Sequence, residues 1–348
     1  MVSIGLFTNL KSGKNKLDLI RYGQNRRLKK LRTVIKDGNQ GKVYITGEAS
    51  DYLGDLEGKI LQACQDKPEV LAIDGGDGTM STVLTMFDKH WQGELPPIAI
   101  IPGGTFNILP KKMGIKNPFK YLSRISNTTD LDDLTVKGIN MMRVIDGQHQ
   151  EHLSFSVGVG LPVTMLEEAY KKKHMKYLRI ALMMTRVVGS AMINGRYYQM
   201  LNKHRALAIS TQGNAGKTTE DKEKWLGIIA QTIDFPGIPR FLPQPKIFRK
   251  AETDGRFHAI GTNVNLSKLL QYLPAIYSGD SPQYGSWESE QTYPVLSLNK
   301  QLKDLTIQAD KPFKYQFNGE LSFGYQPCLT KELYIMADKT FNFIEDDF

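Results

Sequence analysis

The sequence contains very little cysteine and no hydrophobic run long enough to cross a bilayer. Its 348 residues include two cysteines, Cys64 and Cys328, which are far apart in the chain. This argues against a disulfide framework or a zinc site and favours a reducing cytosol. The longest apolar segment, 177–193, is interrupted by two arginines and is too short to span a membrane. The first residues lack the basic region of a signal peptide, so we expect a cytoplasmic protein.

Negative charge is scarce in the first 42 residues. They contain eleven Lys and Arg against two Asp, which accounts for the whole formal net charge of +9. Within this stretch Leu28, Leu31, Val34 and Ile35 recur at helical spacing, and the cations lie on the other faces. The basic helix is either a solvated surface or a patch that attracts an anion, such as a nucleotide or anionic lipid headgroups. It has no recognition motif and no interleaved aromatic residues, so we expect no nucleic-acid partner.

The length favours two domains. In the first, apolar runs alternate with helical patterns, and the runs "LAI" and "IAII" contain no polar residue, as in strands buried on both faces. This alternation predicts a parallel sheet covered by helices. We therefore expect an α/β domain over 1–137. Its expected strands are 2–9, 42–46, 69–74 and 97–104, and its expected helices lie near 25–37, 51–66 and 79–91.

Beyond residue 137 the pattern changes to short alternating runs. Two of them flank Asp146 and Gly147, which is a hairpin signal, and a helical pattern covers 163–193. We expect a mainly antiparallel β-sandwich domain with this helical insertion over 138–348, and a C-terminal strand that returns toward the first domain. The polar stretch 210–224 is expected to be a mobile loop. Further strands are expected at 205–211, 225–232, 257–264, 305–309, 314–320 and 332–337.

A glycine-rich turn follows the strand expected at 69–74. It consists of Asp74, Gly75, Gly76, Asp77, Gly78 and Thr79. Glycines at the start of a helix can expose a nest of backbone N–H groups to a phosphate. An aspartate beside a polyphosphate is favourable when a cation lies between them, so Asp77 is a candidate Mg²⁺ ligand, directly or through water. Asp74 is open to a role as a cap, and a tight turn with an Asp cap is the alternative interpretation of the whole stretch.

Two further polar turns follow strands of the same expected sheet. The strand at 97–104 ends in Pro-Gly-Gly-Thr, and the first strand ends in a turn that contains Asn, Ser, Gly and Lys. Ligands of open α/β sheets bind outside the carboxyl ends of the strands. The sequence therefore predicts that the three turns converge on one crevice. The residues of these two turns that we expect to line the crevice are Asn9, Ser12, Lys14, Gly104, Thr105 and Asn107.

The segments "GGDGT" (75–79) and "PGGTFN" (102–107) together resemble the motifs of the diacylglycerol kinase catalytic-domain family, which includes soluble bacterial lipid kinases and sphingosine kinases. "TNLKSGK" (8–14), "SFSVGVGL" (154–161) and "YQFNGELS" (315–322) resemble further segments of that family, so the likeness runs along the chain. It implies a first domain similar to those of NAD kinases and phosphofructokinases. It also implies an ATP- and Mg²⁺-dependent transfer of the γ-phosphate to a lipid hydroxyl of the diacylglycerol or sphingosine type.

The resemblance also assigns roles to residues. It implies that Asp77 organises Mg²⁺ for catalysis, and that Asn318 and Glu320 occupy the turn that carries the family's catalytic acids. The partners it implies are a lipid substrate and, peripherally, an anionic membrane, in phospholipid biosynthesis; a homodimer is also allowed. The residues implied to contact ATP are Asn9, Ser12, Lys14, Gly75, Gly76, Gly78, Thr79, Gly104, Thr105 and Asn107.

Three positions that are usually acidic in the family hold Thr82, Pro162 and Asn318. An amide side chain cannot accept the substrate proton, so the usual general base is missing, although Glu320 remains to take over or to hold metal. Two interpretations stay open. One is an active lipid kinase with altered catalysis, and the other is a catalytically impaired, nucleotide-binding, membrane-associated regulatory protein.

Three other features receive less weight. Segment 211–218 nearly matches a P-loop but lacks its first glycine. His149 and His152 are interpreted as surface residues of an exposed strand rather than as metal ligands. The helical pattern after residue 163 is interpreted as a core helix, with an interfacial helix beside a lipid entrance as the alternative.

Overall fold

The structure is a computed structural model that describes residues 2–12, 15, 25–37, 41–46, 52–104, 107–170, 195–203, 205–212, 218–233, 255–271, 298–318, 322–323 and 326–346. The chain divides into two compact units. We call Met1–Ile139 together with Thr340–Phe348 the N-terminal unit, and Asn140–Lys339 the C-terminal unit. The middle of the near-P-loop, 213–217, and residues 171–193 of the helical segment expected at 163–193 lie outside the described residues.

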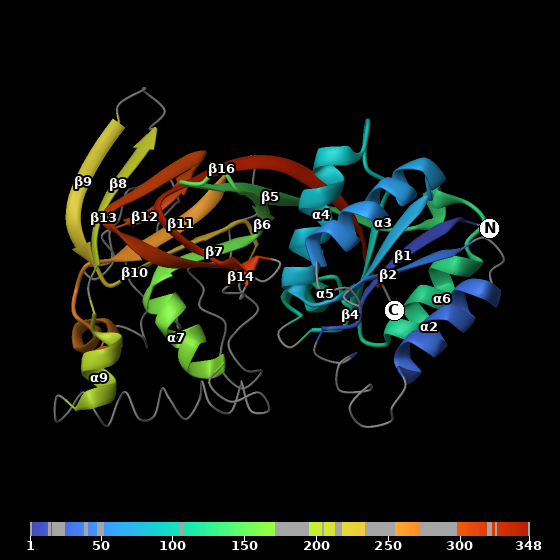
Figure 1. The fold of residues 1–348 in the computed structure, drawn as a ribbon, viewed down its shortest axis with the longest axis horizontal. Coiled ribbons are helices and arrows are strands. Elements are labelled where there is room, and N and C mark those ends of the chain that lie inside the picture. The colour runs from blue at the N-terminus through green and yellow to red at the C-terminus, as the bar shows by residue number, and fades with distance from the viewer. Residues whose placement is uncertain are drawn as a thin grey trace, which may run out of the picture. The chain divides into compact units, whose positions relative to one another are not determined.

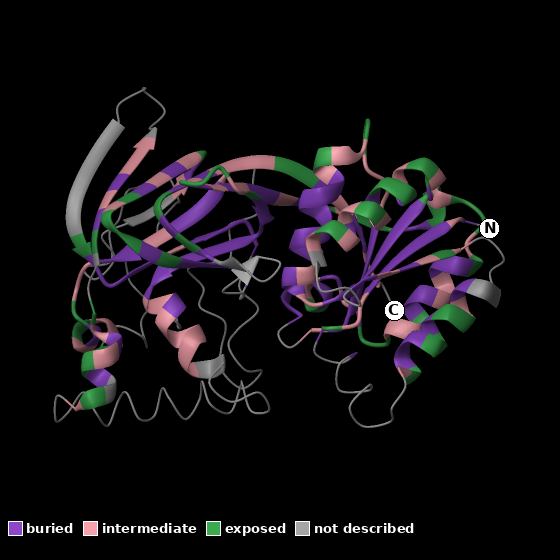
Figure 2. Ribbon diagram, viewed as in Figure 1, coloured by how far each residue is buried: buried purple, intermediate pink, exposed green. Residues whose placement is uncertain are grey.

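Four parallel strands form the sheet of the N-terminal unit, in the order β2-β1-β3-β4. They are β1 (Ile4–Asn9), β2 (Lys42–Thr46), β3 (Val70–Gly75) and β4 (Ile98–Pro102). Strands β3 and β4 are buried along their whole length, and β1 along nearly all of it (Figure 2). Their uninterrupted apolar runs are thus those of strands covered on both faces, and the expected parallel α/β arrangement is confirmed.

Helices cover both faces of this sheet. Figure 1 shows α3 (Tyr52–Asp66) and α4 (Asp77–His90) on one face and α2 (Arg26–Asp37) and α6 (Pro118–Asn127) on the other. Helix α2 buries Leu28, Leu31 and Ile35, so the apolar face expected from the spacing is the one that packs. Two short helices, α5 (Ile108–Lys112) and the 3₁₀ helix η1 (Leu131–Asp133), follow β4 and α6.

The last residues of the chain complete the N-terminal unit. Strand β16 (Leu329–Ile344) reaches into it, where Phe343 pairs in parallel with Ile98 of β4. The hydroxyl of Tyr121 in α6 donates a hydrogen bond to the carbonyl of Ile344 over 2.8 Å. Arg124 donates to the carbonyl of Glu345 over 2.9 Å. The unit is therefore built from two segments that are distant in the sequence.

The C-terminal unit is strand-rich, and the strand pairs that the structure describes inside it are antiparallel. One run of neighbouring strands has the order β12-β11-β10-β7-β13. The helices described in the unit include α7 (Leu161–Tyr170) and α9 (Arg196–Leu201), and residues 266–271 are also helical. The strands are β5 (Val136–Asp146), β6 (Glu151–Ser154), β7 (Ser156–Gly160), β8 (Arg205–Gln212), β9 (Thr218–Trp225), β10 (Gly227–Gln231), β11 (Phe257–Thr262), β12 (Leu298–Leu302), β13 (Asp304–Phe317), β14 (Ser322–Phe323), β15 (Gln326–Pro327) and β16.

Two expectations about this unit were wrong. Both described ends of the polar stretch 210–224, which was expected to be a mobile loop, are strands: one end belongs to β8 (Arg205–Gln212) and the other to β9 (Thr218–Trp225), and the two strands pair. A strand that pairs along one edge only tolerates a polar sequence such as this one, because its other edge and one face can remain hydrated. The separate strands expected at 305–309 and 314–320 are parts of one strand, β13, with a register shift between Gln308 and Phe313.

His152 also departs from expectation, because its side chain is only 1% exposed whereas His149 is exposed. The imidazole stacks on Phe317 with ring centroids 5.1 Å apart, and its Nε2 lies 3.1 Å from the hydroxyl of Tyr315. Burial lowers the pKa of His152 to about 4, which keeps the ring neutral at pH 7.

Among the helices that the structure describes, none combines the length and the apolar character needed to cross a membrane.

Candidate functional site

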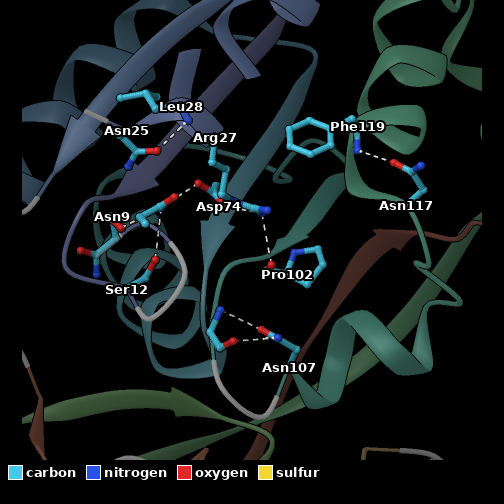
Figure 3. A network of polar contacts seen from close by, with 12 residues as sticks. Asn9, Ser12, Asn25, Arg27, Leu28, Asp74, Pro102, Asn107, Asn117 and Phe119 are labelled. Carbon is cyan, nitrogen blue, oxygen red and sulfur yellow. Dashed lines mark hydrogen bonds and ion pairs between the residues drawn. The ribbon is translucent and has the colours of Figure 1, made fainter. Parts of the chain in front are cut away.

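The turns that follow β1, β3 and β4 converge at one edge of the parallel sheet. The strand register places Thr8 opposite Asp74 and Gly75 opposite Pro102. Across the turns, the Asn9 side-chain amide donates to the hydroxyl of Thr79 over 3.1 Å, and the Gly103 N–H donates to the Gly75 carbonyl over 2.7 Å. The predicted convergence of the three turns is therefore present in the structure (Figure 3).

Gly76 and Gly104 bring two of these turns into backbone contact. A Cβ atom added to Gly104 would lie 2.3 Å from the Cα of Gly76, and one added to Gly76 would lie 3.1 Å from the Cα of Gly104. A Cβ on Gly75 would lie 2.5 Å from the Cβ of Thr79. Glycine is thus required here by close packing. Gly76 is also the N-cap residue of α4, and no side chain caps this helix. The first N–H groups of α4 therefore receive no hydrogen-bond acceptor from the N-cap side chain.

Asp74, for which the sequence left a role as a cap of the turn open, is the anchor of a buried ion pair. It is fully buried, and its Oδ1 accepts hydrogen bonds from the Nε and Nη2 of Arg27 over 3.0 and 2.8 Å. The Asn15 side chain donates to its Oδ2 over 2.8 Å. Arg27 also donates to the Pro102 carbonyl over 3.2 Å (Figure 3). One arginine of α2 therefore ties the ends of β3 and β4 together.

Sequence reasoning missed Arg27 and Asn15 as site residues. The basic stretch was interpreted as a surface, yet Arg27 lies four residues before Leu31 and eight before Ile35, which places it on the buried face of α2. That spacing is the signal that could have identified it, because a cation on the packed face of a helix needs a buried anion.

Asp77 connects the β3 and β4 turns. Its Oδ1 accepts from the N–H groups of Ile108 and Leu109 over 2.9 and 3.3 Å, and its Oδ2 accepts from Ile108 over 3.1 Å. These are the first amides of α5, so the carboxylate caps that helix. Burial raises the pKa of Asp77 to about 6, and the two amides and the charge of Lys111 oppose the rise.

Asn107 closes the turn after β4. Its backbone is in the left-handed region, with φ of 48°, where asparagine is better tolerated than most residues. Its side chain accepts from the Gly104 N–H and donates to the Gly104 carbonyl, both over 2.9 Å. The amide is thus committed to shaping the loop. Thr105, which lies inside the loop, is outside the described residues, as is Lys14.

Ser12 and Thr82 also have internal partners. The Ser12 hydroxyl accepts from the Asn15 side chain over 3.2 Å and is 8% exposed. The Thr82 hydroxyl donates to the Gly78 carbonyl of α4 over 2.9 Å. At the usually acidic position, Thr82 therefore bonds within its own helix.

Asn318, at the end of β13, is held in a single orientation. Its backbone has a φ of 50°, and its side chain is 1% exposed. The Oδ1 atom accepts from the hydroxyl of Ser154 and from the N–H groups of Phe155 and Ser156, over 2.9, 3.0 and 3.1 Å. Three donors on one atom identify it as the oxygen. The Nδ2 group then points elsewhere as a donor, so Asn318 cannot act as a general base. Glu320 lies outside the described residues, and Pro162 lies in the first turn of α7.

The described carboxylates do not build a direct magnesium site. No group of three or more His, Cys, Asp or Glu side chains suitable for a metal occurs within the described ranges. Asp74 and Asp77 both use their oxygens on protein donors. Mg²⁺ commonly keeps several waters and relies on substrate phosphates, so a cluster of three protein carboxylates is not a requirement for binding it.

Part of the chain resembles a known family of kinases. Residues 3–136 match the family model of the diacylglycerol kinase catalytic domain. A Staphylococcus aureus (strain JH9) protein named "Putative lipid kinase" is 30% identical over 155 residues, which make up 42% of this chain and 47% of that protein. The chain thus matches about half the length of such curated relatives.

Solved structures show a similar fold over nearly the whole chain. The crystal structure of a diacylglycerol kinase from Bacillus anthracis str. Sterne covers 99% of this chain and 97% of its own, with a TM-score of 0.58 and 14% sequence identity. A second structure from that organism has the same coverage, a TM-score of 0.61 and 17% identity. At these identities the likeness shows the fold alone.

Proposed function

Because residues 3–136 match the family model of the diacylglycerol kinase catalytic domain, we propose that this protein is a lipid kinase that transfers the γ-phosphate of ATP to a lipid hydroxyl. The observation that carries the proposal is the convergence of the turns after β1, β3 and β4, in which Gly76 and Gly104 touch backbone to backbone. Such an edge of a parallel sheet, with an uncapped helix N-terminus, is suited to a polyphosphate.

The phosphates are proposed to contact backbone N–H groups at the start of α4 and in the turn after β4. The helix dipole of α4 favours negative charge at that end. Asp77 positions the two turns relative to each other through α5, and Arg27 does so through Asp74 and Pro102. The other residues proposed to contact ATP are Asn9, Ser12, Lys14, Gly75, Gly76, Gly78, Thr79, Gly104, Thr105 and Asn107.

Magnesium supplies charge neutralisation for the phosphates when it is bound. Since the described carboxylates are engaged by the protein, we propose that the ion is held mainly by the phosphates, with Asp77 behind a water. Phosphoryl transfer of this kind depends chiefly on alignment and electrostatic stabilisation, because its transition state is largely dissociative. The absence of a base at Asn318 is therefore compatible with turnover, and Glu320 is the acid proposed to assist.

The test is mass spectrometry of lipids incubated with purified protein and MgATP, over a panel that contains diacylglycerol and sphingosine. Gly104→Ala places a methyl group against Gly76 and should lower kcat/KM for ATP at least tenfold, which corresponds to about 1.4 kcal/mol. Gly58→Ala in α3 is the matched control, because a Cβ there meets nothing within 4 Å. It should leave the rate unchanged.

A chain that binds ATP but yields no phosphorylated lipid under these conditions would refute the kinase proposal and support the regulatory alternative. A Gly104→Ala variant with full activity would show that the nucleotide does not depend on these turns. Asp77→Ala should also lose activity, because it frees the first amides of α5.

A further inference from the structure

Asn15 is a buried amide that joins the turn after β1 to the end of β3. The residue is 0% exposed. Its Nδ2 group donates to the carbonyl of Asn9, to the hydroxyl of Ser12 and to the Oδ2 of Asp74, over 3.0, 3.2 and 2.8 Å. Two of these oxygens belong to the β1 turn and the third belongs to β3. One side chain thus links two of the three converging turns.

These contacts determine which way the Asn15 amide points. The Asn9 carbonyl and the Asp74 carboxylate can only accept hydrogen bonds, so the atom that faces them is the nitrogen. The Oδ1 atom of Asn15 has no hydrogen-bond partner within the described ranges, and a buried acceptor without a partner is unfavourable. The contacts of Nδ2 therefore outweigh this cost and hold the amide in one orientation.

This orientation also fixes the role of the Ser12 hydroxyl. Because the Asn15 nitrogen can only donate, the Ser12 oxygen accepts from it, and the hydroxyl hydrogen is left for a different acceptor. The Ser12 backbone is held as well, since its N–H donates to the Asn9 carbonyl over 3.1 Å. Ser12 is 8% exposed, so part of the serine reaches solvent although Asn15 does not. Asn15 thus sets both the position of Ser12 and the direction of its hydrogen bonds.

The β1 turn is attached on both faces of the parallel sheet. Asp74 faces α2, because it pairs with Arg27 of that helix. The Asn9 side chain reaches the other face, where it donates to the hydroxyl of Thr79 in the first turn of α4 over 3.1 Å. Figure 1 shows α2 and α4 on opposite sides of the sheet. The bond from Asn15 to Asp74 therefore supplies an attachment of the turn on the α2 face.

Resting on the ATP site proposed above, we propose that Asn15 is a positioning residue for the nucleotide. It holds the β1 turn against β3, and it orients the Ser12 hydroxyl so that the serine donates its hydrogen to a phosphate oxygen. Asn15 itself is buried and does not touch the nucleotide. A hydrogen bond to a charged phosphate oxygen is stronger than one between neutral groups, so the direction of the Ser12 O–H contributes to affinity. A carboxylate at position 15 would reverse that direction, because it can only accept.

The test measures the Kd of MgATP by isothermal titration calorimetry and the stability by urea titration. Asn15→Asp should raise Kd about tenfold, because Ser12 then donates to the new carboxylate, and it should lower stability, because that carboxylate faces Asp74. Asp74→Asn keeps its oxygen with Arg27 and turns an amide nitrogen toward Asn15. It should therefore lower stability but leave Kd within about threefold.

The double variant Asn15→Asp, Asp74→Asn separates the two roles. It exchanges the amide and the carboxylate and so restores a hydrogen bond between positions 15 and 74. It should regain stability relative to Asn15→Asp and yet keep the weak binding of ATP, because the residue at position 15 still accepts from Ser12. A purely structural role of Asn15 would instead make Kd follow stability.

Two further variants serve as controls. Ser12→Ala should raise Kd as much as Asn15→Asp does, and Asn15→Asp should add less than about threefold in that background, because both changes remove the same hydrogen bond. Asn117→Asp is the matched control for the added charge. The Asn117 side chain caps α6 through its oxygen, which an aspartate does equally well, so Kd should not change.

A Kd that returns to the wild-type value in the double variant would overturn the orienting role, as would a full tenfold effect of Asn15→Asp in the Ser12→Ala background. If Asn15→Asp does not fold by circular dichroism, Asn15→Ala takes its place; Kd should then rise about fivefold, and an unchanged Kd would overturn the proposal. A wild type that does not bind MgATP would overturn this proposal together with the nucleotide site. A wild type that binds MgATP but phosphorylates no lipid refutes the kinase proposal alone, and the same Kd values still decide the role of Asn15.

Discussion

Replacement of Arg27 with methionine probes the buried ion pair that joins α2 to the ends of β3 and β4. Arg27 is 9% exposed and Asp74 is fully buried, with Nη2 and Oδ1 2.8 Å apart. Methionine keeps much of the aliphatic stem and removes the charge. Loss of one partner of a buried pair destabilises a protein by about 3–5 kcal/mol, because the other charge is left uncompensated. Asn15 still donates to the Asp74 Oδ2. We therefore expect the free energy of unfolding to fall by about 3 kcal/mol, at the lower end of this range.

The free energy of unfolding is measured from urea titrations at pH 7 followed by circular dichroism, at low and at high salt. The double variant Arg27→Met, Asp74→Asn should recover much of the loss, since it leaves no unpaired charge. Lys42→Met is the control, because it breaks the exposed Lys42–Asp66 pair and should lower stability by about 0–1 kcal/mol.

Two outcomes would refute this reasoning about Arg27. A loss below about 1 kcal/mol would place the pair in the class of surface ion pairs. A loss that disappears at high salt would show that solvent ions reach the pair, since buried charges are screened much less.

The remaining predictions concern charge. Burial raises the pKa of Asp77 to about 6, above its unfolded value of about 4, so its contribution to stability is complete below pH 4 and falls by about 3 kcal/mol as the pH rises to 6. Urea titrations of Asp77→Asn should lack this fall, and an unchanged profile would contradict the assignment. Burial lowers the pKa of His152 to about 4, so its contribution is lost as the pH falls from about 6.5 to 4, by about 3 kcal/mol; His152→Gln should flatten that loss. Helix α2 exposes Lys29, Lys30 and Arg32, so sedimentation with anionic liposomes should weaken as salt rises, and salt-independent binding would exclude an electrostatic membrane face.

The architecture of the N-terminal unit was accessible from the sequence because its strands are covered on both faces. Local burial is visible in the sequence as an apolar run, as in β3, or as apolar residues at helical spacing, as for Leu28, Leu31 and Ile35. In the C-terminal unit the same reasoning failed for β9, whose polar sequence does not report its pairing with β8. A strand on the edge of a sheet is specified by its neighbour, and a neighbour's register is not visible in the chain itself.

The candidate site, too, could be predicted from the sequence only in part. The glycine turns and their convergence follow from strand order and from the position of ligands at the carboxyl edge of such sheets. The buried pair of Arg27 and Asp74 and the three donors on Asn318 depend on contacts between residues 47 and more than 160 positions apart. Such contacts decide which carboxylates remain available for chemistry, and spacing along the chain carries no information about them.

The return of the last residues to β4 and α6 bears on how the N-terminal unit can be isolated. A fragment that stops near residue 139, at the boundary of the N-terminal unit, would expose the edge of β4 at Ile98 and leave the Tyr121 hydroxyl without its acceptor at Ile344. Autonomous folding of that unit should therefore require residues 340–348 to be joined to it by a short linker, in effect excising the C-terminal unit as an insertion.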